Sequence, residues 1–408
     1  MDPIQDPFSP SAGSPPPELA GRDDVLRQAA VALGRIKNRR SERSPLMIGL
    51  RGVGKTVLLN EIRKKAEIDG FLTTMVEAQE GRTLGLVLGP GLRKVLLALS
   101  PGKAAGEKAA RGFRVLKSFL SGVKIGTDEI FMAIDSPPEK GGADSGLLSS
   151  DLPDLFVAIG EAAAEAGTAV AVIIDELQYL SEDELSAMIM AIHRVSQESL
   201  PLILIGAGLP QLAGNTGSAK SYAERLFLFP KIGPLPRADA RKALQEPVTS
   251  LGVSFTDEAL DEIFLQTEGY PYFLQEWGSQ SWRGAQRSPI DVDVVRLASR
   301  DAIQSLDKNF FTVRFDRLTP REKDYLRALA ELGSEPQRSG EIASVLSMSS
   351  ESAAPLRSGL ISKGMIYSPQ HGDTAFTVPL FDQFMKRTMP DVPRPRPRPR
   401  KHGTKPRA

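Results

Sequence analysis

The sequence predicts an α/β fold, in which a parallel β-sheet covered by helices is followed by a helical region and a small C-terminal domain. Three observations support this prediction. Apolar strands alternate with helices along residues 46–208, which is typical of a parallel sheet buried on both faces. The strand pattern then fades, and residues 237–305 keep only helical periodicity. Residues 318–387 show three helical patterns and then two short strands, the order found in a winged helix.

The elements of the first half can be assigned in order along the chain. Residues 1–17 are rich in Pro, Ser and Gly, so we expect a flexible, disordered leader. An amphipathic helix follows, with apolar residues at helical spacing from Leu19 to Ile36. A short apolar strand then leads through a glycine-rich turn into a helix, and a second strand covers residues 71–78. Residues 82–150 form an insert to which the sequence assigns no chemistry.

The alternation of helix and strand resumes at residue 151. A helix, a strand that ends at Asp175, another helix and a strand over residues 201–208 follow in turn. A last short strand is expected near residue 230. The predicted domains are a leader (1–17), a sheet domain (18–234), a helical lid (235–310), a winged helix (318–387) and a basic tail (388–408).

Composition excludes several classes of protein. Of the 408 residues, 41% are hydrophobic and 25% are charged, as in ordinary globular proteins. The chain has no cysteine, which excludes disulfides, thiolate zinc sites and cysteine nucleophiles. No apolar run approaches the roughly 20 residues of a membrane-spanning helix, and the acidic start of the chain does not resemble a signal peptide. We therefore expect a cytoplasmic protein that does not enter a membrane.

Charge is distributed unevenly along the chain. Residues 391–408 carry seven Lys and Arg residues against Asp391, a net charge of +6, which leaves residues 1–390 at −5. Repeated Pro-Arg pairs in this tail favour an extended, disordered polyproline II segment. Such a tail either contacts a polyanion such as DNA or is merely solvated, and the sequence alone leaves both alternatives open.

A phosphate-binding motif lies between the first strand and the next helix. It consists of a glycine, four residues, and then Gly-Lys-Thr, which is the spacing of a P-loop. The glycines allow successive backbone N–H groups to point at a phosphate, and the following helix adds its positive N-terminus. We expect the lysine to reach the β- and γ-phosphates and the threonine hydroxyl to reach Mg²⁺. The predicted ATP-binding residues are Gly49, Leu50, Arg51, Gly52, Val53, Gly54, Lys55, Thr56 and Val57.

Two acidic residues strengthen this prediction. Asp175 and Glu176 end the apolar strand that begins near residue 169. A carboxylate in that place can hold the coordination shell of Mg²⁺ together with Thr56, and its neighbour can activate a water molecule. The sequence therefore predicts a site for ATP and Mg²⁺, with Thr56 and Asp175 at the metal and Lys55 and Glu176 as catalytic residues.

These motifs resemble those of AAA+ and STAND-type P-loop ATPases, closest to the Orc1/Cdc6-like branch, over roughly residues 18–310. The resemblance implies that a segment ahead of the P-loop lines the adenine pocket, that Arg225 is an arginine finger for a neighbouring subunit, and that Pro271 approaches the nucleotide from the lid. Each role has a plainer alternative. The segment ahead of the P-loop could be a helix cap with a surface arginine, Arg225 could be a surface charge, and Pro271 could lie in a simple loop between helices. The adenine-pocket residues implied in this way are Leu19, Ala20, Gly21 and Arg22.

The sequence also departs from this family. The strand over residues 201–208 ends in Gly206, Ala207 and Gly208, where such an ATPase usually presents a polar residue to the γ-phosphate. Tyr272 stands where many lids of the family carry an arginine. Because both substitutions remove groups that act on the γ-phosphate, we expect nucleotide binding with slow hydrolysis, as in a switch.

The predicted winged helix has few cations for a DNA-binding domain. Its third helix, residues 349–364, offers only Arg357 and Lys363 as cations, and the hairpin contains no arginine. DNA binding would therefore depend on the basic tail, and binding of a protein by the same domain is a comparable alternative. The three histidines, His193, His371 and His402, show no metal-ligand spacing.

Three functions are compatible with these features. The first is an ATP-dependent switch, in which nucleotide binding and slow hydrolysis move the winged helix. The second is a DNA-binding regulator or mobile-element protein with a mainly structural nucleotide. The third is a STAND-type signalling or defence scaffold that self-oligomerises. The P-loop, the acidic pair and the lid favour the first.

Overall fold

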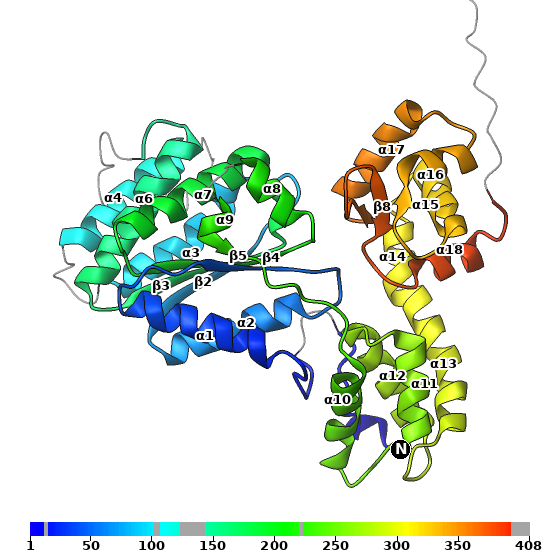
Figure 1. Ribbon diagram of the computed structural model, residues 1–408. Coiled ribbons are helices and arrows are strands. Elements are labelled where there is room, and N and C mark those ends of the chain that lie inside the picture. The colour runs from blue at the N-terminus through cyan, green and yellow to red at the C-terminus, as the bar shows by residue number, and fades with distance from the viewer. Residues whose placement is uncertain (12–14, 101–106, 123–142, 220–222, 393–408) are drawn as a thin grey trace, which may run out of the picture. The chain divides into compact units, whose positions relative to one another are not determined.

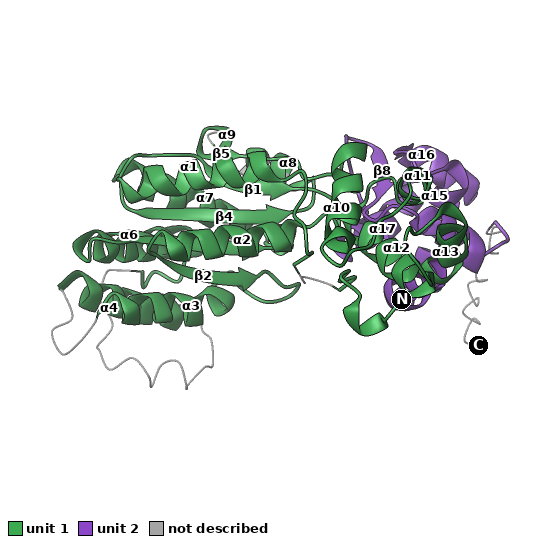
Figure 2. Cartoon of the chain, turned by 90° about the horizontal axis from the view of Figure 1, so that it is seen from below, with its two compact units in different colours: residues 1–302 green, residues 303–408 purple. Residues whose placement is uncertain are grey.

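The computed structural model describes residues 1–11, 15–100, 107–122, 143–219 and 223–392. The chain divides into two compact units, residues 1–302 and residues 303–408, which are coloured separately in Figure 2. The predicted basic tail lies almost entirely outside the described residues.

The first unit is built on a five-stranded parallel sheet (Figure 1). Its order is β2-β3-β4-β1-β5, and the pairs between neighbouring strands are all parallel. Every residue of β3 and of β4 is buried, as their unbroken apolar sequences require. This sheet confirms the predicted α/β fold. Its strands are β1 (Ser44–Ile48), β2 (Phe71–Glu77), β3 (Ala169–Asp175), β4 (Leu202–Gly208) and β5 (Phe227–Leu228).

The register brings the carboxyl ends of the strands together at one edge of the sheet. Ile48, the last residue of β1, pairs with Gly208, the last residue of β4. In the same way Glu77 and Asp175 end β2 and β3 opposite each other. In open parallel sheets, ligands bind outside this edge. The P-loop after β1 and the acidic pair after β3 therefore lie at the same edge, with β4 between their strands.

Helices cover both faces of the sheet. Figure 1 shows α1 (Asp23–Lys37) and α2 (Lys55–Ile68) on one face, and α6 (Leu148–Glu165) and α7 (Glu182–Gln197) on the other. Ser181 begins α7 through a capping box, in which its hydroxyl accepts from the backbone of Glu184. Three short elements complete the sheet domain: the 3-10 turn η2 (Leu177–Tyr179), α8 (Leu212–Ala219) and α9 (Ala223–Leu226).

The described part of the insert extends the core of this unit. It forms α3 (Leu84–Ala98) and α4 (Glu107–Gly122). Leu88 and Leu92 of α3 and Leu116 of α4 are fully buried, and they belong to the same apolar cluster as residues of β3 and β4. Glu161 of α6 pairs with Lys108 and Arg111 of α4. The described part of the insert therefore contributes to the packing of the sheet domain.

The helical region follows β5 as four helices. Thr256 begins α11 by accepting a hydrogen bond from the backbone of Ala259, and Pro271 occupies the first position of α12, where a missing N–H costs nothing. Trp277 is buried and donates from its indole to Ser299 Oγ at 2.9 Å. The helices are α10 (Arg237–Thr249), α11 (Asp257–Thr267), α12 (Pro271–Gly284) and α13 (Val292–Leu306).

The N-terminal residues differ from the expected flexible leader. A 3-10 turn, η1 (Pro3–Gln5), is followed by Phe8, whose side chain is only 5% exposed. Asp6 accepts from Ser279 Oγ at 2.6 Å and from Arg283 Nε at 3.1 Å. The ring of Phe8 lies against Gly278, where an added Cβ would come within 2.7 Å of it. A polar segment is thus held against α12, which its own composition does not reveal.

The second unit combines helices with a three-stranded antiparallel sheet of order β6-β8-β7. Helices α15, α16 and α17 precede the hairpin of β7 and β8, in the predicted order, and a further helix, α18, follows it. Thr319 begins α15 through a capping box with Glu322. The elements are a π-helical turn η3 (Asp307–Phe311), α14 (Thr312–Phe315), α15 (Pro320–Leu332), β6 (Gln337–Arg338), α16 (Ser339–Val345), α17 (Ser350–Ser362), β7 (Ile366–Tyr367), β8 (Asp373–Phe376) and α18 (Phe381–Thr388).

Within the described ranges, no helix combines the length and the apolar character that crossing a bilayer requires.

Candidate nucleotide-binding site

The glycines of the P-loop are required by its conformation. Gly52 and Gly54 have φ angles of 83° and 92°, in the left-handed region that side chains disfavour. Gly54 is also the N-cap of α2. At Gly49 an added Cβ would lie 2.1 Å from the carbonyl oxygen of Ile232, which leaves no room for a side chain. These constraints shape residues 49–56 into the loop that the motif predicted.

Lys55 lies inside this loop. Its side chain is 6% exposed, and its ammonium donates to the carbonyl oxygens of Gly49 at 2.9 Å and Leu50 at 2.8 Å. Burial lowers the pKa of Lys55 to about 8, although Glu176 and Asp175 act in the opposite direction. The ammonium is thus poorly compensated, and a phosphate in the loop would supply the missing negative charge.

Thr56 and Asp175 join the P-loop to the end of β3. The hydroxyl of Thr56 donates to Asp175 Oδ2 at 2.6 Å. Asp175 is 4% exposed, and burial raises its pKa, while the hydrogen bond from Thr56 opposes that increase. The two motifs, separated by more than a hundred residues, therefore meet in one hydrogen bond.

A hydroxyl and a carboxylate are suitable oxygen ligands for Mg²⁺. No cluster of three or more His, Cys, Asp or Glu side chains able to hold a metal occurs in the part of the chain that the structure describes. A Mg²⁺ held by Thr56 and Asp175 would take its remaining ligands from phosphate and water, as this ion prefers.

Glu176 begins a tight turn directly after β3. Its backbone is left-handed, with φ 54° and ψ 39°, and its N–H donates to Asp175 Oδ1 at 2.8 Å. Its carboxylate accepts a hydrogen bond from the side-chain amide of Gln178. A strained backbone of this kind is commonly retained at functional sites.

Sequence analysis did not identify Glu77 as part of this edge. Glu77 is the last residue of β2 and pairs in register with Asp175. Its pKa is raised by burial and by the negative charges of Asp175 and Glu176, and Arg51 acts in the opposite direction. Its position as the only acid of the predicted strand 71–78 was the available signal. It adds a third carboxylate to the edge.

The start of α12 contacts the P-loop. The Tyr270 hydroxyl donates to the carbonyl oxygen of Arg51, and the N–H of Tyr272 donates to the carbonyl oxygen of Gly52 at 3.3 Å. Pro271 lies between these two residues, at the start of the helix. The segment predicted to approach the nucleotide from the lid is therefore adjacent to residues 49–56.

Arg22 is buried and 8% exposed, unlike the surface arginine of the plainer alternative. Its guanidinium donates to the carbonyl oxygens of Val53 at 3.2 Å and Gly233 at 2.6 Å. Burial lowers its pKa, and Asp239 partly offsets this effect. The Arg22 side chain therefore joins the P-loop to the segment that precedes the lid, and both of these hydrogen bonds are made to backbone carbonyl groups. Leu19 is half-buried and Gly21 is exposed beside it.

The remaining predicted residues lie in less constrained places. Arg225 belongs to α9, directly before β5, and its side chain is exposed. Val57 is buried in the first turn of α2. The single chain therefore places Arg225 on a surface, where a neighbouring subunit would have to bring a nucleotide to it.

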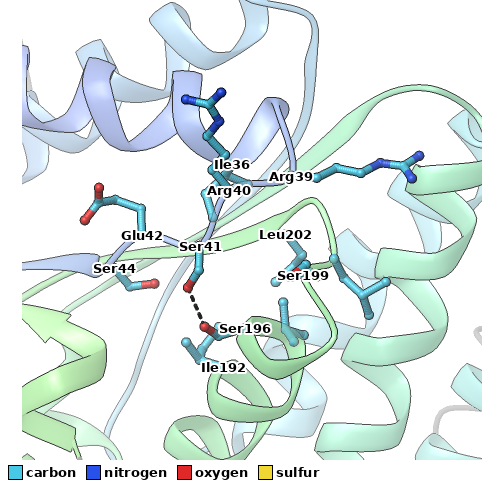
Figure 3. Close-up of a pocket in the computed structure, with 12 residues that line it drawn as sticks. Ile36, Arg39, Arg40, Ser41, Glu42, Ser44, Ile192, Ser196, Ser199 and Leu202 are labelled. Atoms are coloured by element: carbon cyan, nitrogen blue, oxygen red, sulfur yellow. Dashed lines mark hydrogen bonds between the residues drawn. The ribbon is translucent and has the colours of Figure 1, made fainter.

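A small cavity lies at the other edge of the sheet (Figure 3). Its lining includes Ser44, which begins β1, and Leu202, which begins β4. Ser41 and Ser196 share a hydrogen bond of 2.7 Å across it. Because it lies at the amino ends of the strands, this cavity is separate from the P-loop edge.

Both cations of the third helix predicted for the winged helix, residues 349–364, are engaged within the second unit. Arg357 donates to Thr374 Oγ1 at 2.9 Å, to Ser368 Oγ at 2.8 Å and to the carbonyl oxygen of Asp373 at 2.9 Å. Lys363 pairs with Glu322 at 2.7 Å. Arg357 thus fixes the β7-β8 hairpin to α17. Both cations are bonded to groups of the second unit and not directed at a DNA phosphate.

Comparisons with known families and structures agree with this geometry. Residues 18–205 match the family described as AAA ATPase domain, and residues 308–385 match a domain of unknown function, DUF8462. No curated protein sequence matches the chain. The Walker-type ATPase PABY2304 of Pyrococcus abyssi shares 16% identity, with a TM-score of 0.57 over 90% of this chain and 96% of that one. At this identity the likeness concerns the fold alone.

Two further structures are similar at lower scores. The Orc1 protein of Aeropyrum pernix in complex with DNA has 16% identity and a TM-score of 0.44, over 92% of this chain and 94% of that one. The Holliday junction branch migration motor RuvB of Thermotoga maritima has 13% identity and a TM-score of 0.41, over 87% and 92%. The match over residues 18–205 and the parallel sheet together support an AAA+ P-loop ATPase domain.

Proposed function

We propose that this protein is an ATPase that acts as a slow nucleotide-dependent switch, in which ATP and Mg²⁺ at the P-loop control the helical lid and, through it, the C-terminal unit. The observation that carries the proposal is the hydrogen bond between Thr56 and Asp175 beside the buried Lys55. It unites the phosphate-binding loop with the acidic strand end that metal-assisted phosphoryl transfer requires.

In the proposed reaction, a water oxygen forms a bond to the γ-phosphorus while the bond to the oxygen of ADP breaks. Glu176 accepts a proton from the water, and the products are ADP and phosphate. Lys55 and the backbone N–H groups of the loop stabilise the phosphate oxygens. Thr56 and Asp175 would hold a Mg²⁺, which would supply positive charge to the phosphate groups.

The coupling to the lid would run through α12. Tyr270 and Tyr272 donate to carbonyl oxygens of the P-loop, so a change of the loop on binding or losing the γ-phosphate would act directly on the helix start. Arg22 would transmit the same change to Gly233, just ahead of the lid. These contacts support a switch because they tie the ligand-binding loop to a separate helical element.

The end of β4 supports slow turnover. Gly206, Ala207 and Gly208 bring no polar side chain to the P-loop edge, so fewer groups act on the γ-phosphate. The same feature favours a second candidate, a regulator in which the nucleotide is mainly structural and DNA is bound through the basic tail. The internal bonds of Arg357 and Lys363 weigh against DNA reading by α17 itself.

ATP binding by a Lys55→Ala variant tests the site. We expect the affinity for ATP to fall by at least about 10-fold, because the charged contact with the phosphates is lost. Lys64→Ala is the matched control, since Lys64 lies on the same helix and is exposed. Equal ATP affinity in the wild type and Lys55→Ala would refute the assignment of the P-loop.

Self-assembly is a separate part of the proposal. Arg225 is exposed just before β5, where it would serve as an arginine finger in an oligomer. Light scattering with and without ATP measures the mass of the protein in solution and so tests self-assembly directly. A mass that stays monomeric with ATP would remove the arginine finger and the scaffold alternative together, while leaving nucleotide binding intact.

A further inference from the structure

A side-chain amide joins the end of β3 to the end of β4. Gln178 donates from Nε2 to the carboxylate of Glu176. Its other amide atom, Oε1, accepts from the N–H of Leu209 at 3.0 Å. Leu209 directly follows β4, so one glutamine bridges the carboxylate proposed to activate water and the backbone of the neighbouring strand.

The surrounding backbone holds this bridge in place. Gln178 lies in the turn η2, where the N–H of Tyr179 donates to the carbonyl oxygen of Glu176 at 3.0 Å. Leu177, in the same turn, is 1% exposed and anchors it in the core. Glu176 and Gln178 are therefore held in one short, hydrogen-bonded turn, and their side chains meet without a long flexible segment between them.

The glycine at the end of β4 makes room for the amide. A Cβ added at Gly208 would lie 3.1 Å from Gln178 Oε1 and 3.0 Å from a methyl group of Leu212. Both distances are tighter than ordinary van der Waals contact. The absence of a side chain at Gly208 thus leaves the space that the Gln178 amide occupies, and the polar group at the end of β4 comes from the turn after β3.

We propose that Gln178 is a positioning residue for hydrolysis, which holds the carboxylate of Glu176 at the carboxyl end of β4 in the orientation that accepts a proton from water. The inference rests on the proposed ATPase function. The hydrogen bond from Gln178 fixes one oxygen of the half-buried Glu176 carboxylate, and this also fixes the direction of the second oxygen. A carboxylate without such a bond rotates between several orientations. In this role Gln178 acts through Glu176.

Steady-state ATP turnover by a Gln178→Met variant of the full chain tests the proposal. Methionine keeps the length of the side chain and removes both hydrogen bonds. We expect kcat to fall by about 10- to 100-fold, as for other residues that orient a reactive group, with the affinity for ATP changed by less than about 2-fold. Gln197→Met, on the exposed end of α7, is the matched control and should leave kcat unchanged.

A second variant separates the two hydrogen bonds. Gln178→Glu keeps an acceptor for Leu209 but loses the donor to Glu176, so it is expected to lose as much turnover as Gln178→Met. In a Glu176→Gln background, where turnover is already lost, adding Gln178→Met should leave the affinity for ATP and the thermal stability unchanged. A purely structural role would instead lower ATP affinity and thermal stability in both backgrounds.

The outcomes distinguish this inference from the function on which it rests. If the wild type hydrolyses ATP and Glu176→Gln does not, yet Gln178→Met keeps full turnover, the inference is overturned and the ATPase function stands. A higher kcat in Gln178→Met would show that the amide restrains Glu176, which also overturns it. If the wild type shows no turnover, both fall.

Discussion

Burial opposes the charge of two central residues of the site. The pKa of Lys55 is lowered to about 8 and that of Asp175 is raised, in both cases mainly because the protein interior disfavours the charged form. A nucleotide phosphate next to Lys55 and a metal ion next to Asp175 would each restore the charged form. The electrostatics of the site therefore favour these two ligands.

The affinity for ATP should fall as the pH rises above about 8. Below that value Lys55 is already charged in the free protein, so binding needs no proton. Above it, the ligand must first draw a proton onto the neutral amine, which weakens binding by up to about 10-fold per pH unit. Calorimetric titrations at about pH 7.5 and about pH 9.5, on either side of this pKa, measure the change.

Lys55→Arg provides the control for this pH dependence, because a guanidinium stays charged throughout the range. Its affinity for ATP, whatever its absolute value, should be the same at the two pH values. A wild-type affinity that does not change between them would contradict the assigned role of Lys55.

Single residues differ in how far their roles could be predicted from sequence. Lys55, Thr56 and Asp175 follow from motif spacing, because the edge of a parallel sheet brings the ends of its strands together. Glu77 and Gln178 could not be assigned in that way, since their contacts depend on strand register and on the shape of a 3-10 turn. Arg22 was expected at a nucleotide base, and its partners within the chain are backbone carbonyl groups.

At the scale of elements, the turn before α12 joins the lid to the segment that leads into it. Gly269 has a φ of 72°, and an added Cβ would lie 2.2 Å from the carbonyl oxygen of Leu235. The N–H of Leu235 in turn donates to the carbonyl oxygen of Gly269 at 2.8 Å. Close approach of the two backbones therefore fixes where Tyr270 and Tyr272 meet the P-loop.

Gly269→Ala should destabilise the first unit by about 3 kcal/mol or more, because the backbone strain and the clash add together. Gly252→Ala is the matched control: its φ is 74° and no atom lies within 4 Å of the added Cβ, so only about 1 kcal/mol of strain is expected. Thermal unfolding compares the two variants. Equal losses would show that the contact with Leu235 does not constrain this turn.

The N-terminal segment should detach from α12 when its aromatic anchor is removed. The N–H of Ser9 donates to Gln275 Oε1 at 3.1 Å, so its exchange with solvent deuterium reports on docking. We expect Phe8→Ala to accelerate this exchange. Ile4→Ala is the control, because Ile4 is 92% exposed. An unchanged exchange rate in Phe8→Ala would mean that the polar contacts of Asp6 alone hold the N-terminal segment on α12.

Elements of the sheet were predictable because their apolar periodicity is local. β3 and β4 are continuous apolar runs, and both were expected from sequence. The docking of residues 1–9 was not, because it depends on Gly278, far along the chain. Likewise the burial of α3 and α4 against α6 and the sheet depends on tertiary contacts that no local pattern contains.

For the whole molecule, the cations that could contact DNA fall into two groups. Arg357 of α17 and Lys363, which directly follows this helix, are bonded within the second unit, whereas seven further Lys and Arg residues lie in residues 393–408. If the protein binds DNA, we expect replacement of these seven by Gln to abolish binding and its salt dependence, which would have a slope of up to about −6. Filter binding at several salt concentrations measures this. An unchanged affinity for DNA would show that the DNA-binding surface lies outside residues 393–408.

Turnover of ATP by the purified wild type and by Glu176→Gln, with the bound nucleotide quantified in both, tests whether the P-loop edge hydrolyses ATP. We expect slow turnover in the wild type, and in Glu176→Gln a loss of turnover with ATP retained. Bound ATP without turnover in either protein would contradict this expectation and would identify the nucleotide as structural.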